Sequence, residues 1–255
     1  MSFYCGKYPI IEKRSLAANI YSVTVSAPEC AKAASVGQFA NIAAPGFTLR
    51  RPISICGIDK ERGTLRFVFE VRGKGTAAIA KIREGEFLDI LAPLGNGFRV
   101  PDGKVIVVGG GIGVPPLLGV SALKGGDCSA VLGFRDMSKI ILSDEFKANG
   151  SEVTVCTDDG SAGVHGLVTV PLAEMLSPDI KAVMACGPEP MIKAVVKLCK
   201  ERGVPCQISL EQRMGCGVGA CVVCSCMTVR NGEEYYARVC KDGPVFDAEE
   251  VRFDG

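Results

Sequence analysis

Apolar and polar residues alternate in short segments along the N-terminal part of the chain. In residues 65–72 the larger apolar side chains, from Leu65 to Val71, recur at every second position, as on a strand with one buried face. Glycine, proline and charged residues separate this segment from others of similar length. We expect strands at residues 20–26, 39–43, 52–57, 64–71 and 87–92. Several short strands joined by turns predict an antiparallel β-barrel.

The pattern changes after residue 101, where continuous apolar runs begin to alternate with longer helical segments. The runs are apolar enough for strands buried on both faces, and they cover residues 104–108, 129–134, 152–157 and 182–186. Helices are expected at residues 114–123, 139–149, 168–176 and 189–202. This order predicts an α/β domain with a parallel sheet of the nucleotide-binding kind.

Three domains are therefore expected. Residues 1–101 form the barrel, residues 102–206 form the α/β domain, and residues 207–255 form a small C-terminal module that contains a run of cysteines. A chain of 255 residues is long enough for two domains of ordinary size and a smaller addition.

Composition indicates a globular protein of a reducing compartment. The formal net charge of +1 gives no electrostatic argument for nucleic acid. The longest apolar stretch, residues 105–120, is too short to span a bilayer and contains glycines and two prolines. No signal peptide is expected. Most of the thirteen cysteines are scattered singly, which favours reduced thiols over a disulfide framework, and we expect a cytoplasmic location.

Four cysteines near the C-terminus have the spacing of plant-type [2Fe–2S] ligands. Cys216, Cys221 and Cys224 form a C-x4-C-x2-C run, and Cys240 follows later. The loop from Cys216 to Cys221 is rich in glycine, which lets backbone N–H groups point at sulfur. Structural zinc sites usually use two separate C-x2–4-C pairs, so zinc is the weaker interpretation. A set of buried structural thiols is the third.

A hairpin is expected to return the fourth cysteine to the other three. Asn231-Gly232 favours a two-residue turn between two strands, one on each side. Cys226 could compete with Cys240 as a ligand. On a strand, however, it would share a face with Cys224, so we interpret it as a packed thiol.

Glycine-rich and acidic turns follow the predicted parallel strands. The first strand leads into a turn with Gly109, Gly110, Gly111 and Gly113, which allows close approach of a dinucleotide to the backbone. Such turns also occur for packing reasons, and the spacing is not G-x-G-x-x-G. Cys186-Gly187-Pro188 and Asp158-Asp159 end two later strands at the same sheet edge. Two carboxylates there can bind ribose hydroxyls and repel a 2′-phosphate, which predicts NAD rather than NADP, unless they form only an acidic turn.

The barrel carries two groups suited to phosphate oxygens. Arg51 begins the strand segment Arg51-Pro52-Ile53-Ser54, and Gly73-Lys74-Gly75-Thr76 opens a short helix expected at residues 77–82. A guanidinium and a helix start with a hydroxyl both favour phosphate. Basic residues on strands are usually only solvated, so each motif alone is weak.

Taken together, the motifs resemble the ferredoxin-reductase superfamily. The chain contains R-P-I-S, G-K-G-T, G-G-G-I-G-V-P-P-L, T-D-D-G-S, A-C-G-P-E-P-M and the cysteine run followed by R-V-C-K-D-G-P-V-F. Within that superfamily the chain is most similar to the electron-transfer subunits of NAD-dependent dihydroorotate dehydrogenases, which act in pyrimidine biosynthesis. The resemblance covers essentially the whole chain. It implies a barrel that binds FAD, an α/β domain that binds NAD and a [2Fe–2S] module.

The resemblance also implies roles for individual residues. FAD would be held by Arg51, Pro52, Ile53, Ser54, Val68, Phe69, Glu70, Gly75 and Thr76. NAD would face Gly109, Gly110, Gly111, Gly113, Asp158, Asp159, Cys186, Gly187 and Pro188. The cluster would bind Cys216, Cys221, Cys224 and Cys240, and Cys226 receives no role.

The expected activity is electron transfer by a flavin and iron–sulfur oxidoreductase subunit. A flavin exchanges hydrides and single electrons, whereas a [2Fe–2S] cluster carries one electron at a time. We assign no catalytic base, and the single histidine, His165, is expected at the surface. Dihydroorotate oxidation then belongs to an FMN-containing catalytic subunit, in a heterotetramer with two of each chain. The alternatives are a sister subunit that serves ferredoxin, NADPH or sulfide, and a zinc-stabilised nucleotide-binding module.

Overall fold

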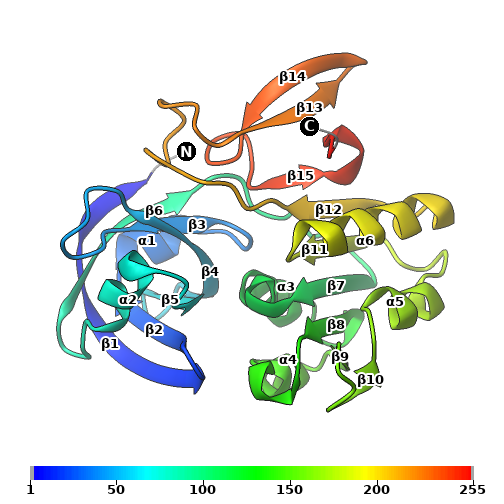
Figure 1. Ribbon diagram of the computed structural model, residues 1–255, viewed down its shortest axis with the longest axis horizontal. Coiled ribbons are helices and arrows are strands. Elements are labelled where there is room, and N and C mark those ends of the chain that lie inside the picture. Colours follow the sequence, from blue (N-terminus) through cyan, green and yellow to red (C-terminus); the bar gives the residue numbers. More distant parts are fainter. Residues whose placement is uncertain (1–2, 254–255) are drawn as a thin grey trace.

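The computed structural model describes residues 3–253 and begins with a closed six-stranded antiparallel barrel (Figure 1). The strand order around the barrel is β1-β2-β5-β4-β3-β6. The predicted antiparallel barrel is therefore confirmed. Its strands are β1 (Tyr4–Ala17), β2 (Ile20–Ser26), β3 (Phe39–Ile42), β4 (Arg51–Asp59), β5 (Thr64–Glu70) and β6 (Phe87–Leu94).

The long strand β1 and the short helix α1 (Pro28–Ala33) were not predicted from the sequence. In β1 only Tyr8 and Ile10 are buried, and the strand pairing shifts register at two places, so its apolar residues do not alternate regularly. The second helix, α2 (Lys74–Ala80), begins three residues before the predicted helix, and it follows β5.

The second part of the chain forms a seven-stranded sheet with the order β10-β9-β8-β7-β11-β12-β15. All neighbours are parallel except β12 and β15, so the predicted parallel sheet is confirmed. Its strands are β7 (Val105–Gly110), β8 (Cys128–Phe134), β9 (Glu152–Thr157), β10 (Val164–His165), β11 (Ala182–Cys186), β12 (Cys206–Ser209) and β15 (Val245–Asp247). The helices are α3 (Pro115–Lys124), α4 (Ser143–Ala148), α5 (Thr169–Met175) and α6 (Glu189–Arg202).

A two-stranded hairpin, β13 (Ser225–Arg230) and β14 (Glu233–Arg238), completes the C-terminal part. Asn231 and Gly232 have φ values of 54° and 83°, as a tight two-residue turn of this kind requires, so the predicted hairpin is confirmed. The expected division after residue 206 falls at the start of β12, and β15 from the third segment pairs with β12. The domain boundaries stay a prediction.

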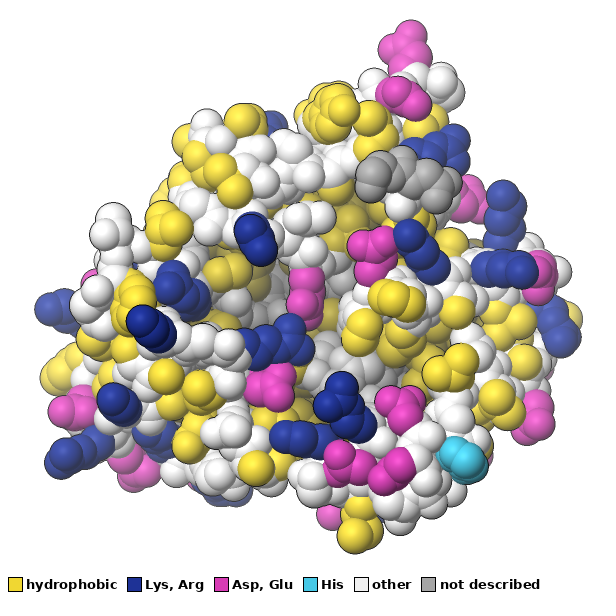
Figure 2. Space-filling view, in the orientation of Figure 1, with side chains coloured by type: hydrophobic (Ala, Val, Ile, Leu, Met, Phe, Trp, Pro, Cys, Tyr) yellow, Lys and Arg dark blue, Asp and Glu magenta, His cyan; other side chains and the backbone are white. Residues whose placement is uncertain are grey.

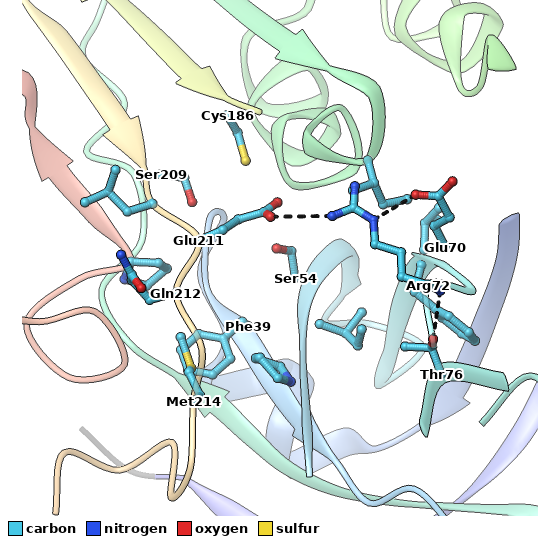
Figure 3. Close-up of a pocket in the computed structure, with 17 residues that line it drawn as sticks. Phe39, Ser54, Glu70, Arg72, Thr76, Cys186, Ser209, Glu211, Gln212 and Met214 are labelled. Carbon is cyan, nitrogen blue, oxygen red and sulfur yellow. Dashed lines mark hydrogen bonds and ion pairs between the residues drawn. The ribbon is translucent and has the colours of Figure 1, made fainter. Parts of the chain in front are cut away.

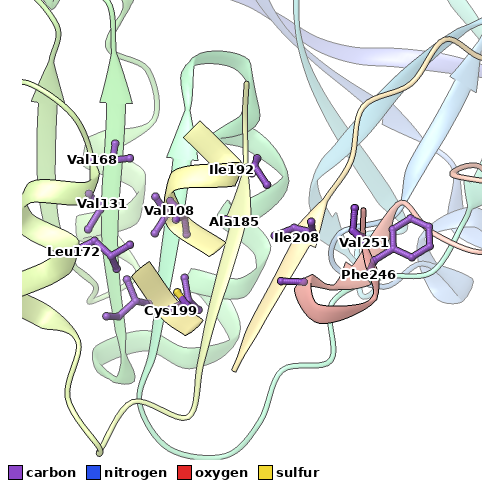
Figure 4. Packing of buried hydrophobic residues seen from close by; sticks show 14 of the residues in the cluster. Val108, Val131, Val168, Leu172, Ala185, Ile192, Cys199, Ile208, Phe246 and Val251 are labelled. Atoms are coloured by element: carbon purple, nitrogen blue, oxygen red, sulfur yellow. The ribbon is translucent and has the colours of Figure 1, made fainter. Parts of the chain in front are cut away.

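One apolar core joins the sheet to the C-terminal module (Figure 4). Val108 and Ala185 of the sheet belong to the same cluster of buried residues as Phe246 and Val251 near the C-terminus. Cys224 and Cys240 belong to it as well. Because this core is continuous, the cysteine module is held in a fixed place against the sheet. No helix within residues 3–253 is long and apolar enough to cross a membrane.

Candidate functional site

The molecule is hollowed between the barrel and the sheet, and two adjoining clefts lie there (Figure 2). The first cleft is lined by barrel strands, by the end of β11 and by the segment that leads from β12 to the cysteines (Figure 3). Its lining brings together these residues predicted from the sequence: Pro52, Ile53, Ser54, Val68, Phe69, Glu70, Thr76 and Cys186. It also contains residues that were not predicted, among them Phe39, Ile112, Ser209, Glu211 and Met214.

Arg51 and Gly75 lie next to one another at the start of α2. A Cβ atom added to Gly75 would lie only 2.5 Å from Nη2 of Arg51, so glycine is what lets the guanidinium approach the helix backbone. Arg51 Nη1 is held by the carbonyl oxygen of Leu49 at 2.6 Å. The Thr76 hydroxyl accepts from the N–H of Arg72 at 3.0 Å and fixes the turn before α2. The Arg51 guanidinium and the N–H groups at the start of α2 therefore lie close together. This combination suits the binding of an anionic phosphate.

The second cleft lies at the carboxyl ends of the parallel strands, where ligands bind in sheets of this kind. Glu70, Arg72 and Ile112 line both clefts, so the two spaces adjoin. Of the residues predicted for the dinucleotide, four line it: Gly110, Gly111, Asp158 and Pro188.

The other predicted residues of this group have different surroundings. A Cβ on Gly109 would lie 2.8 Å from a methyl group of Val114, and one on Gly187 would lie 2.6 Å from Met191. Gly113 packs against the backbone of Cys186 in the same way. These glycines permit close packing and do not line the second cleft.

The acidic turn contributes one carboxylate to the cleft rather than two. Asp159 is outside the lining, and its Oδ1 accepts from the N–H of Ser161 at 2.9 Å. Hydrogen bonding to the Ser161 side chain, and then to its backbone, lowers the pKa of this carboxyl. Arg135 and Lys139 line the cleft beside Asp158 and were not predicted from the sequence. Arg135 directly follows β8, so the strand-end rule that selected Asp158 could have found it.

Ionisable groups of the first cleft are buried or paired. Burial and the nearby Glu211 carboxylate raise the pKa of Cys186 to about 12, against the opposing effect of a hydrogen bond with Ser209. Arg72 Nε lies 2.9 Å from a carboxylate oxygen of Glu70, and its Nη1 lies 4.0 Å from one of Glu211 (Figure 3). Cys186 is therefore a neutral thiol at neutral pH, and both carboxylates are compensated.

The cysteine loop wraps its backbone N–H groups around sulfur. Sγ of Cys216 accepts from Val218, Ala220 and Cys221 at 3.3–3.4 Å. Although partial burial raises it, these N–H groups lower the pKa of Cys216 to about 6. The thiolate form, which binds iron, is thus favoured before any metal arrives.

The fourth cysteine closes the site from the hairpin side. Gly219 N donates to Sγ of Cys240 at 3.1 Å, and Cys240 N donates to Sγ of Cys224 at 3.4 Å. Arg238 fastens the loop because its Nη1 donates to the Gly219 carbonyl at 3.0 Å. The four cysteines thus share one network of backbone contacts, and a donor set of four thiols fits an iron–sulfur cluster.

Cys226 has a different setting. It lies on β13 opposite Ala237, packs against the apolar core, and burial raises its pKa to about 11. Within residues 3–253 no three His, Cys, Asp or Glu side chains meet closely enough to hold a single metal ion. His165 is exposed on β10 and lines neither cleft.

Comparisons with known proteins agree with this geometry. The model of a family described as the iron-sulfur cluster binding domain of dihydroorotate dehydrogenase B matches residues 211–252. The dihydroorotate dehydrogenase B (NAD(+)) electron transfer subunit of Caldanaerobacter subterraneus subsp. tengcongensis is 40% identical over 250 residues, which cover 97% of this chain and 98% of that protein. The same subunit of Geobacillus thermodenitrificans is 42% identical over 253 residues, or 95% and 96% of the two chains.

Solved structures share the fold. A chain of the NADH-dependent reduced ferredoxin-NADP oxidoreductase is 33% identical, with a TM-score of 0.86 over 98% of this chain and 91% of that one. The ferredoxin reductase in carbazole 1,9a-dioxygenase has a TM-score of 0.68 at 20% identity, over 80% and 68% of the two chains. At that identity the second likeness concerns the fold alone.

Proposed function

Because the chain belongs to the family of dihydroorotate dehydrogenase B (NAD(+)) electron transfer subunits, we propose that it passes electrons from a catalytic partner through a [2Fe–2S] cluster and FAD to NAD⁺. The activity serves pyrimidine biosynthesis. The chain is thus an oxidoreductase subunit that needs a partner for dihydroorotate chemistry.

The observation that carries this proposal is the order of the three sites. Met214 lines the first cleft two residues before the first cluster cysteine. Asn41 Nδ2 of β3 donates to the Cys216 carbonyl at 3.3 Å, and Phe39 of the same strand lines the cleft. Glu70 and Arg72 lie between the first and second clefts. Cysteine module, first cleft and second cleft therefore form a continuous series.

The first cleft suits FAD. When bound there, the flavin supplies hydride exchange on one side and single-electron exchange on the other. Pro52, Ile53, Val68 and Phe69 offer an apolar surface for the ring, and Ser54 offers a hydroxyl. Arg51 and the start of α2 stand where they can bind the diphosphate. Arg72, held between Glu70 and Glu211, orients the turn that leads into α2.

Replacing Arg51 by alanine is expected to weaken FAD binding by about 1.5–3 kcal/mol, because a charge-assisted phosphate contact is lost. Fluorescence titration of the flavin-free chain measures this. Arg62→Ala is a matched control, since Arg62 is an exposed arginine in the turn between β4 and β5. Equal FAD affinity in the Arg51 and Arg62 variants would contradict the assignment.

The second cleft suits NAD, bound at the glycine turn after β7 with Asp158 toward the ribose. We expect kcat/KM to be higher with NADH than with NADPH, and Asp158→Ser to reduce that preference about tenfold, because a carboxylate that repels a 2′-phosphate is removed. Asp159→Ser should change the ratio little, since Asp159 lies outside the cleft. An unchanged ratio in Asp158→Ser would contradict the role of Asp158, and it would leave the preference unexplained by Arg135 and Lys139, whose positive charges favour a 2′-phosphate.

The partner is proposed to be an FMN-containing subunit that oxidises dihydroorotate, in a heterotetramer of two copies of each chain. Exposed apolar side chains surround the cysteine loop and the hairpin: Val218, Val222, Val223, Tyr235 and Tyr236. We propose this surface as the docking site, because single-electron transfer is fast only over a short distance.

All thirteen cysteines are unpaired, which supports a cytoplasmic location.

The second candidate function is that of a related electron-transfer subunit with a ferredoxin-linked partner. The structural likeness to the NADH-dependent reduced ferredoxin-NADP oxidoreductase is high, so the same three sites could serve a ferredoxin-linked partner. Anaerobic titration of the purified chain with NADH tests the function common to both. Bleaching of the flavin absorbance followed by the paramagnetic signal of a reduced [2Fe–2S] cluster is expected. A chain that shows neither signal overturns the proposal.

A further inference from the structure

The outer face of β3 lies between the first cleft and the cysteine module. Ala40 and Ile42 belong to the core inside the barrel, so Phe39 and Asn41 lie on the opposite, outer face of the strand. Phe39 lines the first cleft, and it belongs to the same apolar cluster as Cys224. Asn41 is therefore carried by a strand that contacts both sites.

The side chain of Asn41 touches the cysteine loop directly. It is only 1% exposed, and its Nδ2 donates to the Cys216 carbonyl at 3.3 Å. A Cβ atom on Gly217, where φ is 75°, would lie 2.6 Å from the same nitrogen, so glycine lets the loop come this close. Pro52 of β4 is paired with Asn41 and lines the first cleft. One residue thus links the wall of the first cleft to a cluster cysteine.

The Asn41 amide is only partly hydrogen-bonded although it is buried. Its Oδ1 accepts no hydrogen bond from any group within residues 3–253. A buried polar atom without a partner lowers the stability of a fold, and leucine has the same branched shape without this cost. The amide therefore contributes the geometry of this boundary rather than the stability of the fold.

A second asparagine holds the other side of the cysteine module. Asn96 follows β6, and its Nδ2 donates to the carbonyl oxygens of Lys241 at 3.2 Å and of Asp242 at 2.9 Å. Lys241 directly follows Cys240 in the sequence. Asn41 and Asn96 therefore hold the segments of the first and the fourth cluster cysteines against the barrel.

We propose that Asn41 is a positioning residue that fixes the cluster relative to the flavin, with Asn96 as the second point of attachment. The inference rests on the proposed function, because it requires a flavin in the first cleft and a cluster on the four cysteines. NADH supplies two electrons to the flavin, and each electron that leaves the flavin reduces one cluster. The attachment controls the rate of this second step.

Anaerobic rapid mixing of the cofactor-loaded chain with NADH tests the inference, because it resolves flavin reduction from the later reduction of the cluster. In Asn41→Leu the flavin should be reduced at the wild-type rate, since Asn41 lines neither cleft. Cluster reduction, counted per bound cluster, should be about tenfold slower, as is typical when a contact that orients a metal ligand is lost. The melting temperature should equal or exceed that of the wild type, because a buried atom without a partner is removed.

Thr228→Val is the matched control. Thr228 is fully buried, and its Oγ1 donates to the Tyr235 carbonyl at 2.9 Å within the hairpin, away from the barrel. The substitution also replaces a buried polar group by an apolar one of similar shape, but it leaves the contacts between the barrel and the cysteine loop in place. Both reduction rates should stay at the wild-type value.

Cluster reduction at the wild-type rate in Asn41→Leu overturns the inference. An equal slowing of flavin and cluster reduction also overturns it, because the effect would then lie at the flavin. If Asn41→Leu purifies without iron, Asn96→Ala carries the test, and wild-type cluster reduction in that variant is contrary to the inference. These results leave the proposed function standing, whereas a wild-type chain in which NADH reduces neither flavin nor cluster overturns the proposed function itself.

Discussion

Serine in place of Cys216, Cys221, Cys224 or Cys240 is expected to remove most of the iron from the purified chain, whereas Cys226→Ser should retain it. Serine oxygen is a poor ligand for iron in such clusters, which select thiolates. The four cysteines share backbone N–H contacts within one loop and hairpin, but Cys226 packs on β13 against the apolar core.

Iron and acid-labile sulfide per chain, together with the visible spectrum, measure this result. Flavin content is the internal control for folding, because the barrel has an apolar core of its own. Loss of iron in Cys226→Ser with retention in Cys240→Ser would contradict the ligand assignment. Zinc in place of iron in the wild-type chain would restore the alternative that the family match disfavours.

The isolated chain is expected to reduce artificial dyes with NADH and to leave dihydroorotate untouched. The rate of dihydroorotate oxidation should therefore be close to zero for the isolated chain and become measurable only in the assembled protein. Oxidation of a C–H bond in a small acid needs a base and a carboxylate-binding group close to a flavin. In the part of the first cleft that residues 3–253 form, Arg72 lies between Glu70 and Glu211, and burial raises the pKa of the Cys186 thiol to about 12. We therefore expect none of these groups to serve dihydroorotate as a base.

Dye reduction and dihydroorotate consumption are measured on the same preparation. The Cys216→Ser variant distinguishes electron transfer from the flavin to dyes from electron transfer through the cluster to the partner. It should keep NADH-dependent reduction of dyes that accept electrons from the flavin, yet lose transfer to or from the partner, because the cluster is the link. Dihydroorotate oxidation by the chain alone would refute the division of labour.

The sequence predicted the elements whose apolar pattern is regular. Val23 and Val25 of β2 and Leu65, Phe67 and Phe69 of β5 are buried at every second position, and β7 is buried throughout, so the positions of these strands follow from burial on one face or on both. Strand β1 escaped detection because most of its side chains are exposed or half-buried. Strands β12 and β15 are too short to show a period, and they pair although residues 210–244 separate them in the sequence.

In the functional site, spacing along the sequence predicted the residues that lie close together in one stretch of chain. It missed the residues that the fold brings to the site from distant segments. The cysteine loop and the strand-end turns are visible in a single stretch of chain. By contrast, Phe39 and Glu211 reach the first cleft from segments far apart in sequence, and no local motif marks them. Asp158 and Asp159 are neighbours in sequence, but one points into the second cleft and the other closes its own turn.

Coupled turnover with the catalytic partner tests the central claim most directly. The chain is co-purified or mixed with the catalytic partner, proposed to be an FMN-containing subunit that oxidises dihydroorotate, and orotate and NADH are quantified together. The account predicts one NADH for each orotate in the mixture, and no orotate from this chain alone. Orotate formed without the partner, or a mixture that produces no NADH while the same chain couples NADH to a ferredoxin, would contradict it.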